Sequence, residues 1–248
     1  MKNLINKYLN IFGVEIHGSG YIQKLMRSEH KKNEWKTQQK LLDKKASVIF
    51  DVGANRGNTV SKYLSLFPNV KIHAFEPFPD MCKIFLNRYK DNLNVCLNKY
   101  ALSNNIGSAN FYVNTSIDTS SLLKSKNIGA SSDKNCFSVN EIVVNTNTID
   151  NYCLENNISE IDILKIDVQG SELKVLKGAL NMLTSSKIKL IYIETYFKQQ
   201  YINQPLFHDI SKLLYEYNFI LQDIYDPYFS KKNILWCDAI FINLNEIK

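Results

Sequence analysis

The stretch Val48-Ile-Phe-Asp-Val-Gly-Ala-Asn-Arg-Gly57 decides the fold of this chain. Its apolar residues, interrupted by Asp51, predict a buried strand, and the glycines that follow predict a tight turn. Asn58 then begins a helical pattern. Gly53 and Gly57 have no Cβ, so the backbone of the turn can approach a ligand closely. The stretch therefore predicts a ligand-binding turn between a strand and a helix.

A second predicted strand follows at residues 70–75. It ends on Glu76, which Pro77 follows directly. A carboxylate at the tip of the second strand of a βαβ unit is placed to accept hydrogen bonds from the two hydroxyls of a ribose. Together with the preceding turn, Glu76 predicts a cofactor that contains a nucleoside.

Strands and helices alternate along most of the chain. The predicted strands are 48–52, 70–75, 93–98, 161–167, 189–194, 219–224 and 239–242, and the predicted helices are 58–66, 79–90, 149–156, 171–183 and 207–217. Such alternation implies parallel strands with helices on both faces of the sheet. Tyr225-Asp-Pro-Tyr228 is interpreted as the turn of a terminal antiparallel hairpin. The prediction is an α/β fold with a seven-stranded, mostly parallel sheet whose last strand is reversed.

An insertion at residues 104–148 interrupts this alternation. It contains a short strand at 109–113, a stretch rich in Ser, Asn and Lys at 114–135, and a strand at 137–146. A loop of this length within a compact domain is usually functional or disordered. The stretch is therefore interpreted either as a mobile surface loop or as a lid over the substrate.

Residues 1–45 are predicted to be a basic helical appendage, and residues 46–248 the main domain. The appendage holds ten Lys and Arg against four Asp and Glu, a balance of +6 that equals the net charge of the whole chain. It could contact an anionic membrane surface or a nucleotide-linked substrate, or it could be a solvated helix face. Because the remaining residues are balanced in charge, we expect no nucleic-acid partner.

Composition restricts the compartment and the class of protein. The hydrophobic content of 45% is typical of a globular protein. No apolar run is long enough to span a membrane. The five cysteines are odd in number and include no Cys-x-x-Cys pair, so neither a disulfide framework nor a zinc site is expected. These features predict a cytoplasmic protein.

The turn at residues 53–57 distinguishes between two nucleoside cofactors. A dinucleotide-binding turn has the pattern Gly-x-Gly-x-x-Gly, and Gly53-Ala-Asn-Arg-Gly57 lacks its middle and last glycines. Asp51 would repel a pyrophosphate, whereas it suits the ammonium group of S-adenosylmethionine, either directly or through the turn. S-adenosylmethionine is therefore the predicted cofactor, and an NAD-dependent oxidoreductase is the alternative.

Two charged residues interrupt the predicted strand 161–167. Lys165 and Asp167 lie two positions apart and so point to the same face, with Asp167 at the tip where ligands bind. Buried charges need partners, so Lys165 belongs either to a functional site or to a structural ion pair with Asp167 or Glu194. Glu194 ends the neighbouring strand. With Asp167 it could hold Mg²⁺, or either carboxylate could accept the proton of a hydroxyl group.

The chain resembles the FkbM family of S-adenosylmethionine-dependent methyltransferases. The resemblance covers residues 48–194 and is carried by Phe50-Asp-Val-Gly-Ala-Asn-Arg-Gly57, by Phe75-Glu-Pro77 with Ala101-Leu-Ser103, and by Leu164-Lys-Ile-Asp-Val-Gln-Gly-Ser-Glu-Leu-Lys-Val-Leu-Lys-Gly-Ala179. It implies a class I methyltransferase (Rossmann-like) fold and methyl transfer, usually to a hydroxyl of a sugar or other secreted metabolite. The leading hypothesis is an O-methyltransferase acting on a sugar, such as a nucleotide-linked or surface-polysaccharide precursor.

The resemblance also implies which residues form the site. It places the turn at the methionine part of the cofactor, Glu76 at the ribose, residues 100–102 at the adenine, and Asp167 near the amino group and the acceptor. The cofactor-binding candidates are Asp51, Gly53, Asn55, Gly57, Glu76, Pro77, Tyr100, Ala101, Leu102 and Asp167. The catalytic candidates are Lys165, Asp167, Gln169 and Glu194, and the metal candidates are Asp167 and Glu194. The family usually has glutamate where this chain has Gln169, so a non-catalytic S-adenosylmethionine-binding protein is a further alternative.

Overall fold

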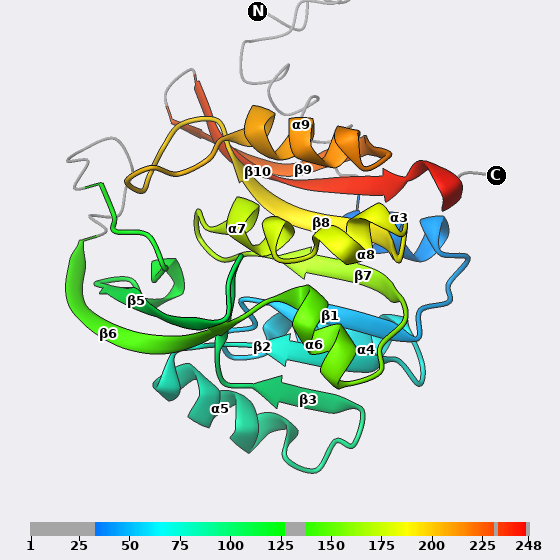
Figure 1. Cartoon of the computed structure of the whole chain (residues 1–248), viewed down its shortest axis with the longest axis horizontal. Helices are drawn as coiled ribbons and strands as arrows, with labels where there is room; N and C mark the ends of the chain where they lie inside the picture. The colour runs from blue at the N-terminus through cyan, green and yellow to red at the C-terminus, as the bar shows by residue number, and fades with distance from the viewer. Residues whose placement is uncertain (1–32, 127–136, 231–232, 247–248) are drawn as a thin grey trace, which may run out of the picture. The chain divides into compact units, whose positions relative to one another are not determined.

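The computed structural model describes residues 33–126, 137–230 and 233–246, and Figure 1 shows its architecture. The strands form two sheets, one of seven strands and one of three. Most of the predicted appendage, residues 1–32, lies outside the described part, so its helices and its membrane contact stay predictions. Within the described ranges, no helix has the length and apolar character needed to cross a membrane.

The large sheet has the strand order β3-β2-β1-β7-β8-β10-β9. Its strands are β1 Val48–Val52, β2 Lys71–Phe75, β3 Val95–Asn98, β7 Ile161–Ile166, β8 Ile188–Tyr196, β9 Phe219–Ser230 and β10 Asn233–Asn243. Neighbours from β3 to β8 pair in parallel, and β10 pairs antiparallel with both β8 and β9. The predicted seven-stranded sheet with its reversed last strand is confirmed. The strand order reverses between β1 and β7, which is where open α/β sheets bind ligands.

The terminal hairpin is longer than the sequence pattern predicts. The run Tyr225–Tyr228 is not the turn but a part of β9, in which Tyr225 pairs with Asp238 and Tyr228 with Trp236. The register shifts between these pairs, and β9 lies at the edge of the sheet. A proline is tolerated at such a position because an irregular edge strand does not need every backbone N–H group.

The predicted helix 171–183 is divided into α7 Glu172–Lys177 and α8 Leu180–Thr184. Gly178, between the two, packs its backbone against the chain after β4, where a Cβ would lie 2.1 Å from the carbonyl oxygen of Ser103. This close packing accompanies the break between the two helices, and helical periodicity alone did not reveal it.

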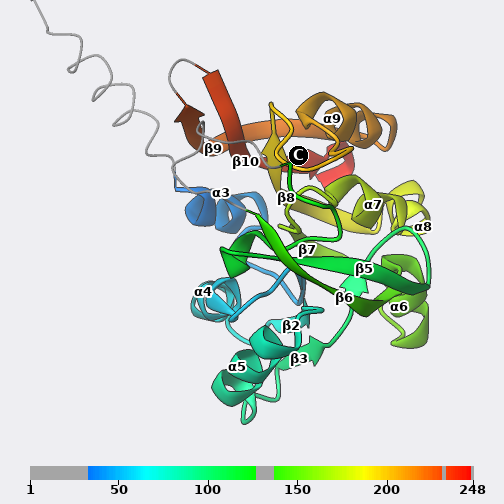
Figure 2. The same ribbon diagram turned by 90° about the vertical axis from the view of Figure 1, so that its left-hand side faces the viewer.

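Helices cover both faces of the large sheet, as Figure 2 shows. One face carries α3 Glu34–Leu41, α4 Asn58–Leu66 and α5 Pro79–Tyr89, and the other carries α6 Ile149–Glu155, α7, α8 and α9 Phe207–Glu216. Each face has its own core of buried apolar side chains.

The described helix of the predicted appendage, α3, packs on one of these cores. The Trp35 ring contacts the rings of Tyr63 and Tyr192, with centroids 5.4 and 5.7 Å apart. The side chain of Gln38 is buried and accepts a hydrogen bond of 2.9 Å from the Tyr63 hydroxyl. Aromatic edge contacts and a buried hydrogen bond thus hold α3 against α4 and the sheet.

The small sheet consists of β4 Ala101–Leu102, β6 Ser138–Asn147 and β5 Gly107–Asn114, in that order. Strands at the positions of β5 and β6 agree with the sequence pattern, whereas the two residues of β4 are too few to give one. β6 pairs in parallel with β4 and antiparallel with β5. Figures 1 and 2 place this sheet beside the edge at which β1, β2 and β7 end.

Candidate active site

A pocket lies at the carboxyl ends of β1, β2 and β7, and residues of the small sheet form one of its walls. Its lining combines polar groups at strand ends with apolar side chains from both sheets. The lining residues are Val52, Gly53, Asn55, Phe75, Glu76, Pro77, Phe78, Met81, Ala101, Leu102, Phe111, Ile117, Asp118, Ser120, Leu122, Asp167, Val168 and Gln169. The pocket therefore brings together the three stretches of sequence that carry Gly53, Glu76 and Asp167.

The turn after β1 presents its backbone to this pocket. The N–H groups of Gly53 and Ala54 both donate to the carbonyl oxygen of Phe75, at 3.0 Å each. Gly53 has φ = +79°, and a Cβ there would lie 1.9 Å from the carbonyl oxygen of Asp167. Only glycine combines this backbone angle with such a close approach. The turn consequently passes directly against the end of β7.

Glu76 follows β2, and its side chain is buried within the pocket lining. Its carboxylate accepts hydrogen bonds from the backbone N–H groups of Asn55 at 2.9 Å and Phe78 at 2.8 Å. Burial raises the pKa of Glu76 from 4.5 to about 7, although these hydrogen bonds oppose the shift. Each carboxylate oxygen keeps further acceptor capacity, which suits the adjacent hydroxyls of a ribose.

Aromatic rings attached to two different sheets form the apolar part of the pocket. Phe78, shortly after β2, stacks on Phe111 of β5 with ring centroids 6.1 Å apart. Met81 and Leu102 line the same pocket, and such apolar surface suits a purine base. The sequence analysis does not find Phe78, Met81 and Phe111, because no spacing in the sequence indicates that Phe111 of β5 stacks on Phe78.

Asp51 and Lys165 form a buried ion pair that does not line the pocket. Lys165 Nζ lies 2.9 Å from Asp51 Oδ1 and 3.7 Å from Asp167 Oδ2, and it donates to the carbonyl oxygen of Gly53 at 3.2 Å. Lys165 thus pairs with Asp167, as predicted, and more closely with Asp51, which the sequence analysis assigns to the cofactor. Desolvation raises the pKa of Asp51, and Lys165 opposes that shift. Burial alone would lower the pKa of Lys165, but the charges of Asp51 and Asp167 raise it.

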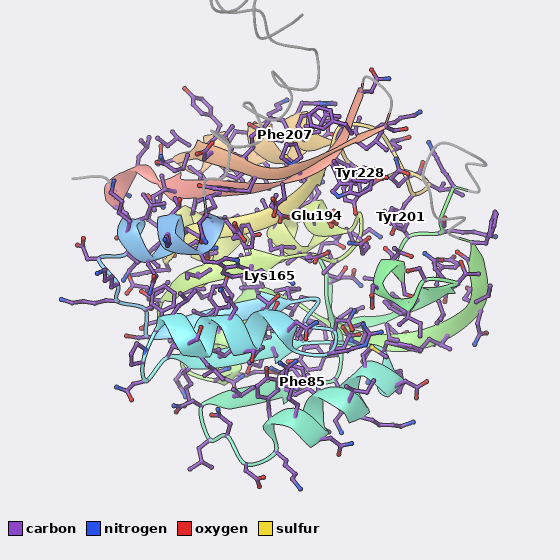
Figure 3. All side chains as sticks on the ribbon, turned by 180° about the vertical axis from the view of Figure 1, so that it is seen from behind. Phe85, Lys165, Glu194, Tyr201, Phe207 and Tyr228 are labelled. Atoms are coloured by element: carbon purple, nitrogen blue, oxygen red, sulfur yellow. The ribbon has the colours of Figure 1, made fainter. Side chains whose placement is uncertain are left out.

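Gln169 connects the two carboxylates predicted at the strand tips. Its Nε2 donates to Asp167 Oδ1 at 2.8 Å and to Glu194 Oε2 at 2.7 Å. Its Oε1 lies 3.1 Å from the Tyr196 hydroxyl and 3.0 Å from the Tyr201 hydroxyl. Each of these hydroxyls also has a nearer acceptor, Glu194 Oε2 for Tyr196 and the carbonyl oxygen of Thr119 for Tyr201. Asp167 and Gln169 line the pocket, and Glu194 lies behind them in β8. Figure 3 shows Glu194 and Tyr201 from the side of the molecule that carries α4.

Glu194 belongs to a group of acidic side chains on neighbouring strands. It accepts a short hydrogen bond from the Tyr196 hydroxyl and pairs in register with Asp238 of β10. Desolvation raises the pKa of Glu194 well above its usual value, and the charges of Asp167 and Asp238 add to this shift. Burial likewise raises the pKa of Asp238 to about 6. A carboxyl group with a raised pKa can hold or release a proton near neutral pH.

The structure gives no support for Mg²⁺ between Asp167 and Glu194. Within the described residues, no group of three or more His, Cys, Asp and Glu side chains could hold a metal ion. Gln169 directs its amide nitrogen, not its oxygen, at both carboxylates. Hard cations such as Mg²⁺ take oxygen ligands, so the side chains present do not fit this ion.

The pocket lining omits five of the predicted site residues, namely Asp51, Gly57, Tyr100, Lys165 and Glu194. Gly57 instead serves packing, because a Cβ there would lie 2.4 Å from the ring of Tyr89. Tyr100 packs against the core that includes Phe75, with ring centroids 6.0 Å apart. The other predicted site residues all line the pocket.

The described part of the insertion reaches the pocket. Asp118, in the short 3-10 helix Ile117–Thr119, accepts hydrogen bonds from the side chains of Asn55 at 3.0 Å and Arg56 at 2.8 Å. The carbonyl oxygen of Thr119 accepts one of 2.8 Å from the Tyr201 hydroxyl. These contacts connect the insertion to the turn after β1 and to the segment after β8. Residues 127–136 of the predicted lid lie outside the described part.

Comparison with known proteins identifies relatives of this chain. A model of the methyltransferase FkbM domain matches residues 51–221. The 2-O-methyltransferase NoeI of Sinorhizobium fredii (strain NBRC 101917 / NGR234) is 28% identical over 192 residues, which cover 73% of this chain and 76% of that protein. Methyltransferase FkbM from Methylobacillus flagellatus KT is a structural match with a TM-score of 0.52 and 13% identity, over 80% of this chain and 44% of that chain. This chain thus spans less than half of that solved protein, and the match concerns the fold.

Proposed function

This chain belongs to the FkbM family of methyltransferases, and we propose that it transfers a methyl group from S-adenosylmethionine to a hydroxyl oxygen of a sugar or glycan. The observation that carries the proposal is the convergence of Gly53, Glu76 and Asp167 on one pocket. They provide a turn without a Cβ, a buried carboxylate for ribose hydroxyls, and a carboxylate at a strand tip for an amino group or an acceptor.

The residues of the pocket fit this cofactor. Gly53 lines the pocket, and its lack of a Cβ lets the turn pack against the carbonyl oxygen of Asp167, which a Cβ would approach to 1.9 Å. Asn55 Oδ1 is a buried oxygen without a hydrogen-bond partner among the described residues, and Asn55 lines the pocket, so a ligand N–H group could satisfy it. Phe78 and Phe111 provide apolar surface for an adenine. The pocket therefore offers complementary groups to the amino acid, the ribose and the base of the cofactor.

Bound S-adenosylmethionine supplies an electrophilic methyl group on a sulfonium. The residues of this chain have two tasks, to hold an acceptor oxygen in line with that methyl group and to accept its proton. We assign proton acceptance to Asp167, whose side chain is 41% exposed and lines the pocket. Lys165 Nζ, 3.7 Å from Asp167 Oδ2, orients this carboxylate from the buried side.

An oxygen acceptor is supported by the relative NoeI, whose name describes 2-O-methyl transfer. A sugar suits the pocket because its lining includes, besides Asp167, the polar side chains of Asn55, Asp118 and Ser120, which can exchange hydrogen bonds with sugar hydroxyls. We further propose that the insertion, which contacts the turn after β1 through Asp118, acts as the lid over the acceptor. The acceptor would be a nucleotide-linked or surface-polysaccharide precursor, methylated in the cytoplasm.

The test begins with calorimetric titration of S-adenosylmethionine and S-adenosylhomocysteine into the wild-type protein and Glu76→Ala. We expect binding that weakens at least about tenfold in the variant, because the ribose loses its acceptor. Labelled methyl transfer to a panel of nucleotide sugars and glycans then identifies the acceptor. Absence of cofactor binding, or preferential binding of NAD, would refute the proposal.

A non-catalytic role is the second candidate, and the observation that favours it is Gln169. Its neutral amide stands where the family usually has a carboxylate, so one possible base is missing. Tight binding of S-adenosylmethionine without transfer to any acceptor of the panel would support this candidate. Transfer that is lost in Asp167→Asn would exclude it.

A further inference from the structure

Gln169 lies in a turn whose backbone is fixed. Its φ is +55°, in the left-handed region, and that of the following Gly170 is +102°. Glu172 Oε1 accepts hydrogen bonds from the N–H groups of Val168 at 3.3 Å and Gly170 at 2.8 Å. A Cβ on Gly170 would lie 3.0 Å from the ring of Tyr201, so that ring packs closely over the turn. These contacts determine where the Gln169 side chain begins and in which direction it extends.

The amide of Gln169 has polar partners at both its nitrogen and its oxygen. A primary amide has two N–H donors and an oxygen with two acceptor sites. Here the nitrogen meets two carboxylates, at 2.8 and 2.7 Å, and the oxygen meets two tyrosine hydroxyls, at 3.1 and 3.0 Å. A flipped amide would place its oxygen against both carboxylates, where like partial charges repel. The network therefore fixes the orientation of this side chain.

The two carboxyl groups that Gln169 joins have few positively charged partners, although Glu194 also accepts a short hydrogen bond from the Tyr196 hydroxyl. Lys165 Nζ lies 3.7 Å from Asp167 Oδ2 but only 2.9 Å from Asp51 Oδ1, so its charge is shared with a nearer partner. Within the described residues, the ion pairs include none that involves Glu194. Burial raises the pKa of Glu194, and the two carboxyl groups that share one donor add to this shift because they repel each other when both are ionised. A cation between them would remove this repulsion.

We propose that Gln169 is a positioning residue whose amide takes the place of a divalent cation between Asp167 and Glu194, so that the acceptor side of this pocket operates without a metal ion. The amide holds Asp167 Oδ1 and leaves the rest of this carboxylate to the pocket. The catalytic meaning of the inference rests on the proposed function. The absence of a cation site, however, is a property of the protein itself and is measured separately.

Cation binding to the purified full-length protein tests this inference, with Mn²⁺ as the probe and electron paramagnetic resonance as the readout. The wild-type protein is expected to show no Mn²⁺ site at this cluster. Gln169→Glu removes the donors and adds a third carboxylate, so it should bind Mn²⁺ at least about tenfold more tightly than the wild type, as expected for oxygen ligands brought together.

A second variant, Gln169→Met, keeps the test independent of whether the glutamate is tolerated. Methionine has a similar length but neither donates an N–H group nor adds an oxygen. It leaves Asp167 and Glu194 without their bridge, so Mn²⁺ affinity should fall between those of the wild type and Gln169→Glu. Gln222→Glu, which adds the same charge at an exposed position of β9, is the matched control and should not change Mn²⁺ binding.

A catalytic readout separates positioning from simple stability. In Gln169→Met we expect affinity for S-adenosylhomocysteine to change less than about threefold, while kcat for the acceptor falls at least about tenfold, because Asp167 is no longer held. Chelator should not affect wild-type turnover. A variant that merely loosened the fold would lower the melting temperature together with the affinities for S-adenosylhomocysteine and for the acceptor.

Two results would overturn the inference. One is a Mn²⁺ site in the wild-type protein that disappears in Asp167→Asn. The other is that both Gln169 variants, folded with an unchanged melting temperature, bind no more Mn²⁺ than the wild type. Failure of the proposed function is distinguishable from either, because it would appear as a lack of S-adenosylhomocysteine binding by the wild-type protein.

Discussion

Lys165 Nζ lies 2.9 Å from Asp51 Oδ1, and the two side chains are buried on adjacent strands, β7 and β1. Removing one partner of such a pair leaves an uncompensated charge inside the protein. We predict that Lys165→Met lowers the free energy of unfolding by roughly 3–5 kcal/mol, measured by urea denaturation at neutral pH. Adding Asp51→Asn should recover a large part of the loss. If Lys165→Met alone lowered the free energy of unfolding as little as the loss of a surface ion pair does, the pair would not be structural.

Gly53→Ala should abolish most cofactor binding. The new Cβ would collide with the carbonyl oxygen of Asp167, and alanine is strained at the positive φ of this position. We expect affinity for S-adenosylhomocysteine to fall more than about tenfold, since the turn must move away from the pocket. Calorimetry measures this. The control is Gly107→Ala, which also has a positive φ but whose Cβ would meet only Asn105 Nδ2, at 4.0 Å. Equal losses in both variants would mean that backbone strain, not the close approach, matters.

Glu76 should make cofactor binding dependent on pH. Its pKa is raised by burial to about 7, and ribose hydroxyls donate best to the ionised carboxylate. Affinity for S-adenosylhomocysteine should therefore increase as pH rises from about 6 to about 8, by up to roughly tenfold per pH unit below the pKa. Glu76→Gln should bind more weakly and show a flatter profile. If Glu76→Gln showed the same pH dependence of affinity as the wild type, the titrating group would be a different one.

The same carboxyl group should affect the stability of the ligand-free protein in the opposite direction. Its folded pKa of about 7 exceeds the unfolded value of 4.5, so between these values the folded state binds more protons. Stability then falls as pH rises from about 4.5 to about 7. Urea denaturation should show a smaller decrease over this range in Glu76→Gln than in the wild type. Identical slopes would contradict the raised pKa.

Phe111→Ala should weaken cofactor binding although Phe111 lies in the small sheet. Its ring stacks on Phe78 and lines the pocket. Removing it should cost roughly 1–3 kcal/mol of binding free energy to S-adenosylhomocysteine, which is typical of an apolar contact surface. Val143→Ala, at an exposed position of β6 in the same sheet, is the control and should leave binding unchanged. If Phe111→Ala bound S-adenosylhomocysteine as tightly as the wild type, the adenine would not lie against Phe111.

Much of the fold was predictable because its signals are local. The turn at Gly53, the alternation of strands and helices, and the antiparallel end of the sheet are all patterns of neighbouring residues. The errors occur where contacts with other parts of the chain decide the local structure. Tyr225-Asp-Pro-Tyr228 reads as a turn, but at a sheet edge the register shift accommodates Pro227. The helix at 171–183 divides at Gly178, where the chain after β4 packs closely against the backbone, and helical periodicity does not reveal this contact.

The sequence by itself assigned Gly53, Glu76 and Asp167 to one edge of the sheet, but not Asp118 and Ser120, which also line the pocket. Gly53, Glu76 and Asp167 each follow a strand that the sequence identifies, and the carboxyl ends of parallel strands share one edge of a sheet. Parallel strands therefore place these residues at one edge of the sheet, and the strand order β2-β1-β7 brings them into one pocket.

Only the tertiary structure decided the partners of these residues. Lys165 pairs with Asp51 because β1 and β7 are neighbours in register, and the order of strands in a sheet is not contained in the pattern of any one strand. Gln169 bridges Asp167 and Glu194, and Phe111 stacks on Phe78, through contacts between distant parts of the chain. The physical reason is that side-chain partners depend on strand order, register and the direction of each side chain. Sequence patterns indicate only which positions are buried and whether the spacing of the apolar residues is that of a strand or of a helix.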